Sequence, residues 1–224
     1  MTRAAAILLL LPALCAPGET RVEWNVDNLS SIGGQPATVV GAPRVIETGA
    51  GRAVEFDGVR DALFVDIHPL AAAQRFTAEV IFRPDPGGSA EQRFLHLQAS
   101  DSKDRVLFEI RLTGDGRWFL DTYIKTGGKG HTLYARGFRH PLGPWYHAAL
   151  VVDGEQMRHY VNGEMELARE IEFRPQGPGR TSLGSRINEV HWFKGAIRKA
   201  RFSPRVLSPE EFLSPGLEAG QGSD

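Results

Sequence analysis

The chain has 224 residues, and its 26 Lys and Arg residues nearly balance its 27 Asp and Glu residues, which gives a formal net charge of −1. A chain of this length fits one large domain or two small ones, and the absence of a linker-like stretch in the middle favours one. The balanced charge offers no basic field to a phosphate backbone, so we exclude DNA and RNA as partners.

The N-terminal segment has the layout of a secretory signal peptide. Arg3 precedes an apolar run at residues 4–11, and small residues follow near Cys15 and Gly18. The segment is too short to span a bilayer comfortably. We therefore expect residues 1–18 to direct the protein to a secreted or periplasmic location.

Two further expectations follow from this segment. If cleavage removes residues 1–18, the only cysteine, Cys15, is lost and the mature domain has no disulfide. The alternative is that Cys15 is a lipid-attachment site, although residues 12–14 fit the usual small-residue pattern poorly. The single domain is then expected over residues 19–214, followed by a flexible tail at residues 215–224.

The rest of the sequence predicts short strands separated by turns. In residues 76–83, Phe76, Ala78, Val80 and Phe82 share one face, and the Pro- and Gly-bearing loop at residues 84–88 ends the strand. With no amphipathic helix longer than two turns, about a dozen such runs predict an all-β sandwich. The runs include residues 22–26, 38–40, 52–56, 62–66, 92–98, 105–112, 117–125 and 132–136.

Turn residues set the connections between these runs. Asp57 and Gly58 are expected to turn the chain back from residues 52–56 into residues 62–66. Near the C-terminus, Ser208, Pro209 and Glu211 have the spacing of a capped helical turn, with Ser208 as the N-cap.

Residues 145–163 predict the central feature of the fold. An apolar run at residues 148–152 meets a turn at Asp153, and a second alternating run at residues 157–161 meets another turn at Asn162. Two antiparallel reversals within so short a stretch predict a β-meander. Met157, His159 and Val161 then share one face of the second strand, because side chains alternate with a period of two.

Three motifs in order resemble one family. The sequence AVEFDG at residues 53–58, the pair of runs ending in YVNG at residues 160–163, and the LSPEE exit at residues 207–211 are similar to laminin G-like domains of the concanavalin A-like lectin/glucanase superfamily. The resemblance implies an all-β, concanavalin A-like jelly-roll β-sandwich of two antiparallel sheets. Its implications for function are weaker, because one fold hosts many activities.

The resemblance also directs attention to the middle strands, where relatives commonly bind sugars. Along residues 117–125, Trp118 and Ile124 share a face expected to be buried, whereas Asp121 and Tyr123 face outward. Aromatic rings stack on sugar faces, and charged groups pair with sugar hydroxyls. The candidate ligand-binding residues are His96, Arg111, Asp121, Tyr123, Tyr134 and His159, with a buried structural role as the alternative for His159.

A calcium site is a second possibility that the resemblance raises. The loop oxygens that would supply it are those of Asp57, Asp61, Asp153 and Asn162, provided that the fold brings them together. The alternative is that these residues serve turn geometry alone. The histidines lack the spacing of a zinc site.

Catalytic motifs are weak in this sequence. Glu164, Glu166 and Glu170 superficially echo the acidic strand of jelly-roll glucanases, but their spacing departs from it and a solvated strand face explains them better. We therefore expect a secreted, non-catalytic, lectin-like or adhesion module that recognises an extracellular glycan. The alternatives are a polysaccharide-degrading glycoside hydrolase or lyase, and a structural sandwich that binds proteins.

Overall fold

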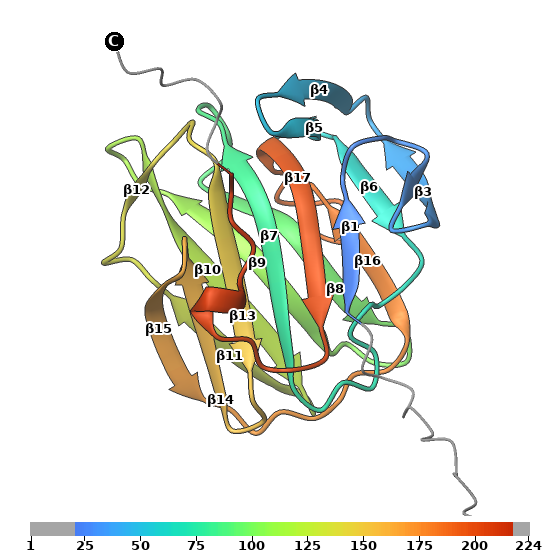
Figure 1. The fold of residues 1–224 in the computed structure, drawn as a ribbon, viewed down its shortest axis with the longest axis vertical. Coiled ribbons are helices and arrows are strands. Elements are labelled where there is room, and N and C mark those ends of the chain that lie inside the picture. Colours follow the sequence, from blue (N-terminus) through green and yellow to red (C-terminus); the bar gives the residue numbers. More distant parts are fainter. Residues whose placement is uncertain (1–20, 217–224) are drawn as a thin grey trace, which may run out of the picture.

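The computed structural model describes residues 21–216, which form two antiparallel β-sheets packed face to face (Figure 1). The predicted all-β sandwich is therefore confirmed. The expected signal peptide at residues 1–18, with Cys15, and residues 217–224 of the expected tail lie outside the described residues. Within residues 21–216, no helix has the length and apolar character needed to cross a membrane.

The first sheet has eight strands. Its path runs through β15 (Glu164–Glu170), β14 (Gln156–Val161), β13 (Tyr146–Val152), β7 (Phe76–Pro84), β17 (Lys194–Ser203), β5 (Gly51–Asp57) and β4 (Arg44–Thr48), and β1 (Val22–Asn25) pairs with β17.

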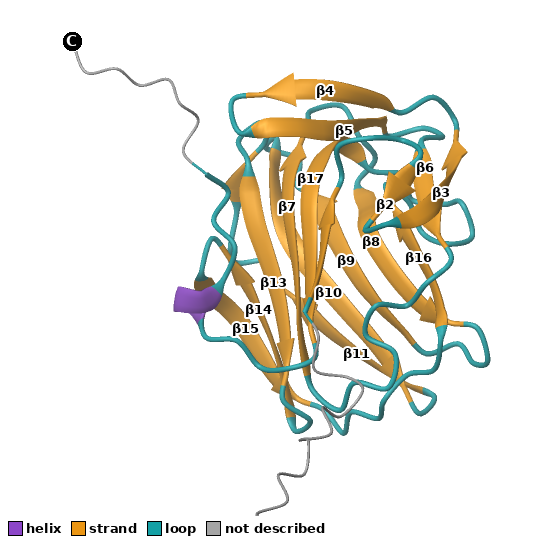
Figure 2. Cartoon of the chain, turned by 45° about the vertical axis from the view of Figure 1, so that its right-hand side comes forward, coloured by secondary structure: helices purple, strands orange, loops and turns teal. Residues whose placement is uncertain are grey.

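The second sheet has nine strands and lies behind the first in the view of Figure 1. Its path runs through β11 (Lys129–Tyr134), β10 (Arg117–Thr126), β9 (Arg105–Leu112), β8 (Glu91–Ala99), β16 (Gly179–Leu183), β6 (Ala62–Val65), β3 (Gln35–Val40) and β2 (Ser31–Ile32), and β12 (His140–Pro141) pairs with β10. Figure 2 shows the two layers from the side, with the 3₁₀ turn η1 (Pro209–Glu211) outside the first of them.

The core fills the space between the sheets. It consists of the side chains that point inward at alternate positions along the strands. Phe82 of β7 stacks on Phe94 of β8 with ring centroids 4.2 Å apart, which joins the two sheets. Trp118 of β10 meets Phe82 edge to face at 5.4 Å. Trp118 and Ile124 are both fully buried, so the face of β10 that the sequence assigned to the interior is confirmed. The opposite face of β10 is therefore free to form part of a site.

The predicted meander at residues 145–163 is also confirmed. Asp153 Oδ1 accepts hydrogen bonds from the N–H groups of Glu155 (3.0 Å) and Gln156 (2.7 Å), which closes the turn between β13 and β14. At the other end of β14, Asn162 and Gly163 take φ angles of 51° and 85° and lead into β15.

The expected hairpin at Asp57 and Gly58 is wrong, although these residues do turn the chain. β5 pairs within the eight-stranded sheet, whereas β6 pairs within the nine-stranded sheet. Asp57 Oδ1 accepts hydrogen bonds from the N–H groups of Val59 (2.8 Å) and Arg60 (2.9 Å), and Asp61 Oδ2 accepts one from the N–H of Asp57 (3.1 Å). These bonds fix a corner that takes the chain from one sheet to the other.

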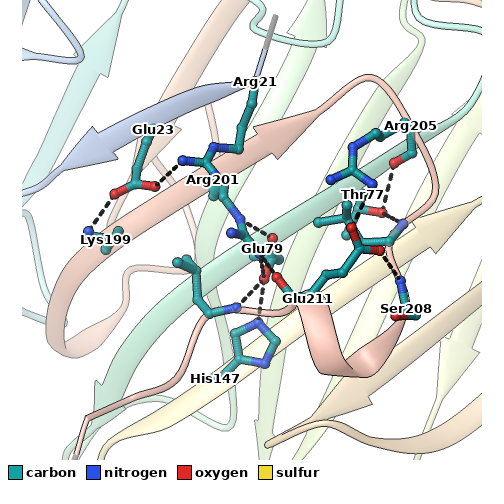
Figure 3. Close-up of polar contacts among 12 residues, drawn as sticks. Arg21, Glu23, Thr77, Glu79, His147, Lys199, Arg201, Arg205, Ser208 and Glu211 are labelled. Atoms are coloured by element: carbon teal, nitrogen blue, oxygen red, sulfur yellow. Dashed lines mark hydrogen bonds and ion pairs between the residues drawn. The ribbon is translucent and has the colours of Figure 1, made fainter. Parts of the chain in front are cut away.

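The C-terminal segment covers part of the outer face of the eight-stranded sheet, as Figure 3 shows at close range. The predicted turn forms as η1, and the Glu211 carboxylate accepts a hydrogen bond from the N–H of Ser208 (3.0 Å). Phe212 then packs against Tyr160, with ring centroids 5.1 Å apart. Beneath the segment, the buried Glu79 carboxylate accepts a hydrogen bond from the N–H of Leu213 (2.7 Å).

Candidate functional site

The outer face of the nine-stranded sheet contains two adjoining hollows, which we call the outer groove. Their volumes are about 310 and 440 Å³, and both are lined by Arg111 and Tyr134. The smaller hollow is also lined by Arg93, Arg105, Leu107, Glu109, Asp121, Tyr123, Thr132 and Arg186. The larger one extends over Glu91, Thr113, Asp115, Phe119, Arg136 and Arg139.

Strand register places these side chains next to one another. Asp121 of β10 pairs with Glu109 of β9 on one side and with Tyr134 of β11 on the other. Glu109 in turn pairs with Arg93 of β8. Directly opposed residues on antiparallel strands share a face and lie within contact distance, so four strands supply one continuous row of functional groups.

Arginines bridge the two carboxyl groups in this row. Arg111 donates from Nε to Asp121 Oδ2 (2.8 Å) and from Nη2 to Glu109 Oε2 (3.2 Å). On the other side of Glu109, Arg93 Nε lies 3.0 Å from its Oε1. Arg111 also forms an ion pair with Glu91. The planar guanidinium groups hold both carboxyl groups in fixed positions on the floor of the groove.

Burial shifts the pKa of both carboxyl groups upward. Glu109 is 3% exposed, and burial, with a further contribution from the Asp121 charge, raises its pKa to about 7 despite the arginines. Burial likewise raises the pKa of Asp121, while Arg111 opposes the shift. Within residues 21–216, Asp121 Oδ1 is buried and has no hydrogen-bond partner. This oxygen lacks the partner that a buried polar atom normally has.

The two tyrosines differ in their availability. Tyr134 is 47% exposed, and its ring meets the buried Phe119 edge to face at 4.7 Å. Tyr123 is covered on one side by the guanidinium of Arg105 at 4.9 Å and lies against Gly130, where an added Cβ would stand 2.5 Å from the tyrosine hydroxyl. Arg111 also lies over the Tyr134 ring at 5.7 Å, but Tyr134 is the more exposed of the two tyrosines, and Tyr123 forms part of the wall.

His96 lies at the edge of the groove beneath the loop at residues 185–192. Its ring is 1% exposed, and Nδ1 accepts a hydrogen bond from the N–H of Ile187 (3.0 Å). Burial, together with the charges of Arg186 and Arg105, holds the pKa of His96 well below its usual value of 6.5. His96 thus supports the loop that positions Arg186, and it is not part of the groove lining.

The comparisons with known proteins agree with this architecture. The family model described as the concanavalin A-like lectin/glucanases superfamily, of the laminin G type, matches residues 57–212. The chain belongs to this superfamily. No curated protein has a significant sequence match to this concanavalin A-like chain.

Solved structures share the fold at low sequence identity. Domain 4 of AbnA, a GH43 extracellular arabinanase from Geobacillus stearothermophilus, in complex with arabinotriose, is 16% identical with a TM-score of 0.63, and the match covers 85% of this chain and 94% of that one. The receptor-binding domain of botulinum neurotoxin D is 15% identical with a TM-score of 0.62, covering 85% and 50%. A heptameric SAP-like pentraxin from Limulus polyphemus is 17% identical with a TM-score of 0.56, covering 71% and 78%.

His159 does not join the outer groove of this concanavalin A-like domain. It faces the space between the sheets, is fully buried, and its Nδ1 lies 3.0 Å from Thr122 Oγ1. Burial lowers its pKa to about 3, so the ring is neutral. The buried structural alternative therefore describes His159, because the period of two turns it inward with Met157 and Val161.

The four candidate calcium ligands do not converge. Asp57 and Asp61 accept backbone hydrogen bonds at the corner between the sheets, whereas Asp153 and Asn162 lie at opposite ends of β14. The part of the chain that the structure describes contains no group of three or more His, Cys, Asp or Glu side chains arranged to hold a metal ion. Turn geometry accounts for all four residues.

The acidic strand β15 differs in one respect from the expected solvated face. Glu164 and Glu170 are exposed, but Glu166 is 8% exposed, and its Oε1 lies 2.6 Å from His140 Nε2. A register shift in the pairing of β14 with β15 leaves Glu166 without an opposing residue on β14. The three glutamates therefore do not form one catalytic face.

Sequence reasoning placed Arg111, Asp121, Tyr123 and Tyr134 together, and all four line the outer groove. It missed Arg93, Arg105, Glu109 and Arg186, which line the same hollow. A signal for Arg105 and Glu109 exists, because they alternate with Arg111 along one strand. Arg186 lies in a loop, where no periodicity points to its position.

Proposed function

We propose that this domain recognises an extracellular glycan, without catalysis, in the outer groove. The observation that supports the proposal best is the exposed ring of Tyr134 beside the row formed by Asp121, Glu109 and Arg111. Binding sites for sugars combine an aromatic face with a few fixed polar groups in this way. The fold it shares with an arabinanase domain determined with arabinotriose gives additional support.

Each group has a specific task in this proposal. The exposed part of the Tyr134 ring stacks on the C–H face of one sugar ring. Arg111 donates a hydrogen bond to a sugar hydroxyl, and Asp121 holds the Arg111 guanidinium in position. Because the ion pairs of Arg111 hold both groups before the ligand arrives, little side-chain entropy is lost on binding. We include the secretory role of residues 1–18 in the proposal, since the ligand lies outside the cell.

A glycan array and calorimetric titration of the mature domain against a panel of polysaccharides test this proposal. We expect saturable binding that weakens by about tenfold or more in Tyr134→Ala, which corresponds to about 1.4 kcal/mol. The matched control is Met165→Ala, which removes a side chain that is 55% exposed on β15 of the other sheet. Absence of binding to every polymer, or equal binding by Tyr134→Ala and the wild type, would contradict the proposal.

A glycoside hydrolase is the second candidate, because Glu109 with its raised pKa lies directly across the strand pair from Asp121. Hydrolases use such pairs of carboxyl groups with separated pKa values. Against it, Glu109 is only 3% exposed, and Arg93 and Arg111 contact both of its oxygens. Release of reducing ends that disappears in Glu109→Gln would favour the hydrolase; unchanged polymer length alongside binding favours recognition.

A further inference from the structure

We propose that the glycan recognised in the outer groove is acidic, and that Arg105 and Arg186 bind its carboxylate or sulfate groups. This inference rests on the function proposed above and specifies the class of ligand. It begins from the charge of the groove: six arginines but only four carboxyl groups line the two hollows. The chain as a whole has a formal net charge of −1, so the positive charge is concentrated at this face.

The excess lies mainly at one end of the groove. Arg93 and Arg111 form ion pairs with Glu91 and Glu109. Arg105 and Arg186, which line the same hollow, form no ion pair with any carboxylate of the described residues. Their charges are therefore not neutralised within the described residues and remain available to a ligand.

The guanidinium of Arg105 is held in place despite lacking a counter-charge, and backbone hydrogen bonds fix the loop that carries Arg186. Arg105 lies over the ring of Tyr123 at 4.9 Å and donates from Nη1 to the backbone oxygen of Lys103 (3.0 Å). Its Nε is buried and has no acceptor within residues 21–216. Arg186 extends from the neighbouring loop. The N–H of Ile187 anchors this loop by donating a hydrogen bond to His96 Nδ1. An anion between these side chains would accept hydrogen bonds from the N–H groups that have no other acceptor.

The positive charges of these arginines contribute to the pKa shifts of groups near them. Burial, then the charges of Arg105 and Arg93, lower the pKa of Arg186. Burial, then the charges of Arg186, Arg105 and Arg93, lower the pKa of His96, whose Nε2 has no partner within residues 21–216. Burial is the larger cause of both shifts, and the part contributed by the arginines reflects repulsion between like charges. A carboxylate or sulfate would relieve this repulsion, whereas a neutral sugar would not.

Arginine also suits the chemistry of these two anions. Its planar fork donates two parallel N–H bonds to a carboxylate or a sulfate. Tyr134 and Arg111 line both hollows. One sugar ring can therefore stack on Tyr134 while an acidic substituent, carried by that sugar or by the next sugar of the polymer, reaches Arg105 and Arg186. The groove then recognises both the sugar ring and its acidic group.

The experiment compares polymers that differ mainly in charge, by calorimetric titration of the mature domain. Polygalacturonate against its methyl ester tests carboxylate recognition, and carrageenan against agarose tests sulfate recognition. We expect the charged member of at least one pair to bind about tenfold or more tightly than its neutral partner, and its affinity to fall when salt screens the groove.

Variants locate the effect. We expect Arg105→Gln and Arg186→Gln each to weaken binding of the charged polymer by about tenfold or more, and Arg186→Lys to restore part of the loss. The matched control, Arg52→Gln, removes the same charge from an exposed position on β5 of the other sheet and should leave affinity unchanged. Thermal unfolding of each variant verifies that the fold is retained.

The outcomes separate the two proposals. Equal binding of neutral and charged members, with Tyr134→Ala still weakened, overturns the acidic ligand and leaves glycan recognition standing. Loss of affinity of the same size in Arg52→Gln and Arg186→Gln also overturns it, since binding then follows net charge alone. If no polymer of either kind binds, both proposals fail.

Discussion

Glu79 offers the strongest test of how the eight-stranded sheet is stabilised. Its carboxylate is fully buried on β7 and accepts hydrogen bonds from Arg201 Nη2 (2.8 Å) and the N–H of Leu213 (2.7 Å), with His147 Nε2 at 3.0 Å (Figure 3). The change Glu79→Gln keeps the shape of the side chain and removes its charge. Arg201, which is 6% exposed, is then left without a carboxylate among the described residues.

The expected loss of stability follows from that burial. Removing one partner of a buried ion pair costs about 3–5 kcal/mol, because the other charge stays buried and uncompensated. Arg201 retains a hydrogen bond to the backbone oxygen of Glu211 (2.7 Å), which places the expectation at the lower end. We therefore expect Glu79→Gln to reduce the free energy of unfolding by about 3 kcal/mol at pH 7.

The sign of the pH dependence provides a second check on Glu79. Burial raises the pKa of this carboxyl group, but the bonds from His147, Arg201 and Leu213 outweigh it and lower the pKa below 4.5. A group whose folded pKa is depressed contributes stability above its unfolded pKa and loses that contribution as the pH falls through the folded pKa. The difference between wild type and Glu79→Gln should therefore be full above about pH 4.5 and shrink below it.

Urea denaturation followed by circular dichroism measures both effects. With a slope of about 2–3 kcal/mol per molar urea, the midpoint should fall by roughly 1–1.5 M at pH 7. The control is Glu47→Gln, an exposed carboxyl group on β4, for which little change is expected. A loss below about 1 kcal/mol for Glu79→Gln, or a loss that persists unchanged at pH 3, would refute the reasoning.

Three further predictions concern single groups. Because burial raises the folded pKa of Glu109 from 4.5 to about 7, its ionisation opposes folding: stability should fall on the order of 3 kcal/mol as the pH rises through that window, and Glu109→Gln should remove this slope in urea titrations. His159 should act in the opposite direction, since its folded pKa of about 3 lies below the unfolded value of 6.5; stability falls as the pH drops from 6.5 towards 3, and NMR should find the ring neutral at pH 5. Gly33→Ala should destabilise more than Gly34→Ala by at least about 1 kcal/mol in the same denaturation assay, because both glycines have positive φ but only at Gly33 would a Cβ meet Trp24, at 2.0 Å. Equal effects of the two glycine variants would mean that backbone strain alone matters.

The alternation of side chains explains what the sequence could predict. Along β10 it separated the buried Trp118 and Ile124 from the outward Asp121 and Tyr123, and the structure has this arrangement. The same rule placed His159 on the face of Met157, and the inward position follows from it. Local patterns thus predict which face a residue occupies wherever the strand is regular.

Pairing between strands is a different matter, because it depends on loop geometry as well as on the alternation of side chains. Glu109 joins Asp121 through the register of β9 with β10, and it joins Arg93 through the register of β8 with β9. The geometry of the short loops that join these consecutive strands sets both registers, and alternation of side chains does not reveal that geometry. The corner at Asp57 has the same character, since its turn residues are compatible with a hairpin and with a change of sheet.

His96 shows how one irregularity can decide the composition of a site. In a regular strand, Arg93 and His96 would point to opposite faces, because their positions differ by an odd number, three. A register shift between Arg93 and Leu95 changes the phase, so that Arg93 opposes Glu109 while His96 opposes Leu107, on the same outer face. The shift lets Phe94 and Leu95 both enter the core and turns His96 beneath the loop that positions Arg186. The cationic end of the groove therefore depends on a single extra residue in β8, which no pattern of period two could have indicated.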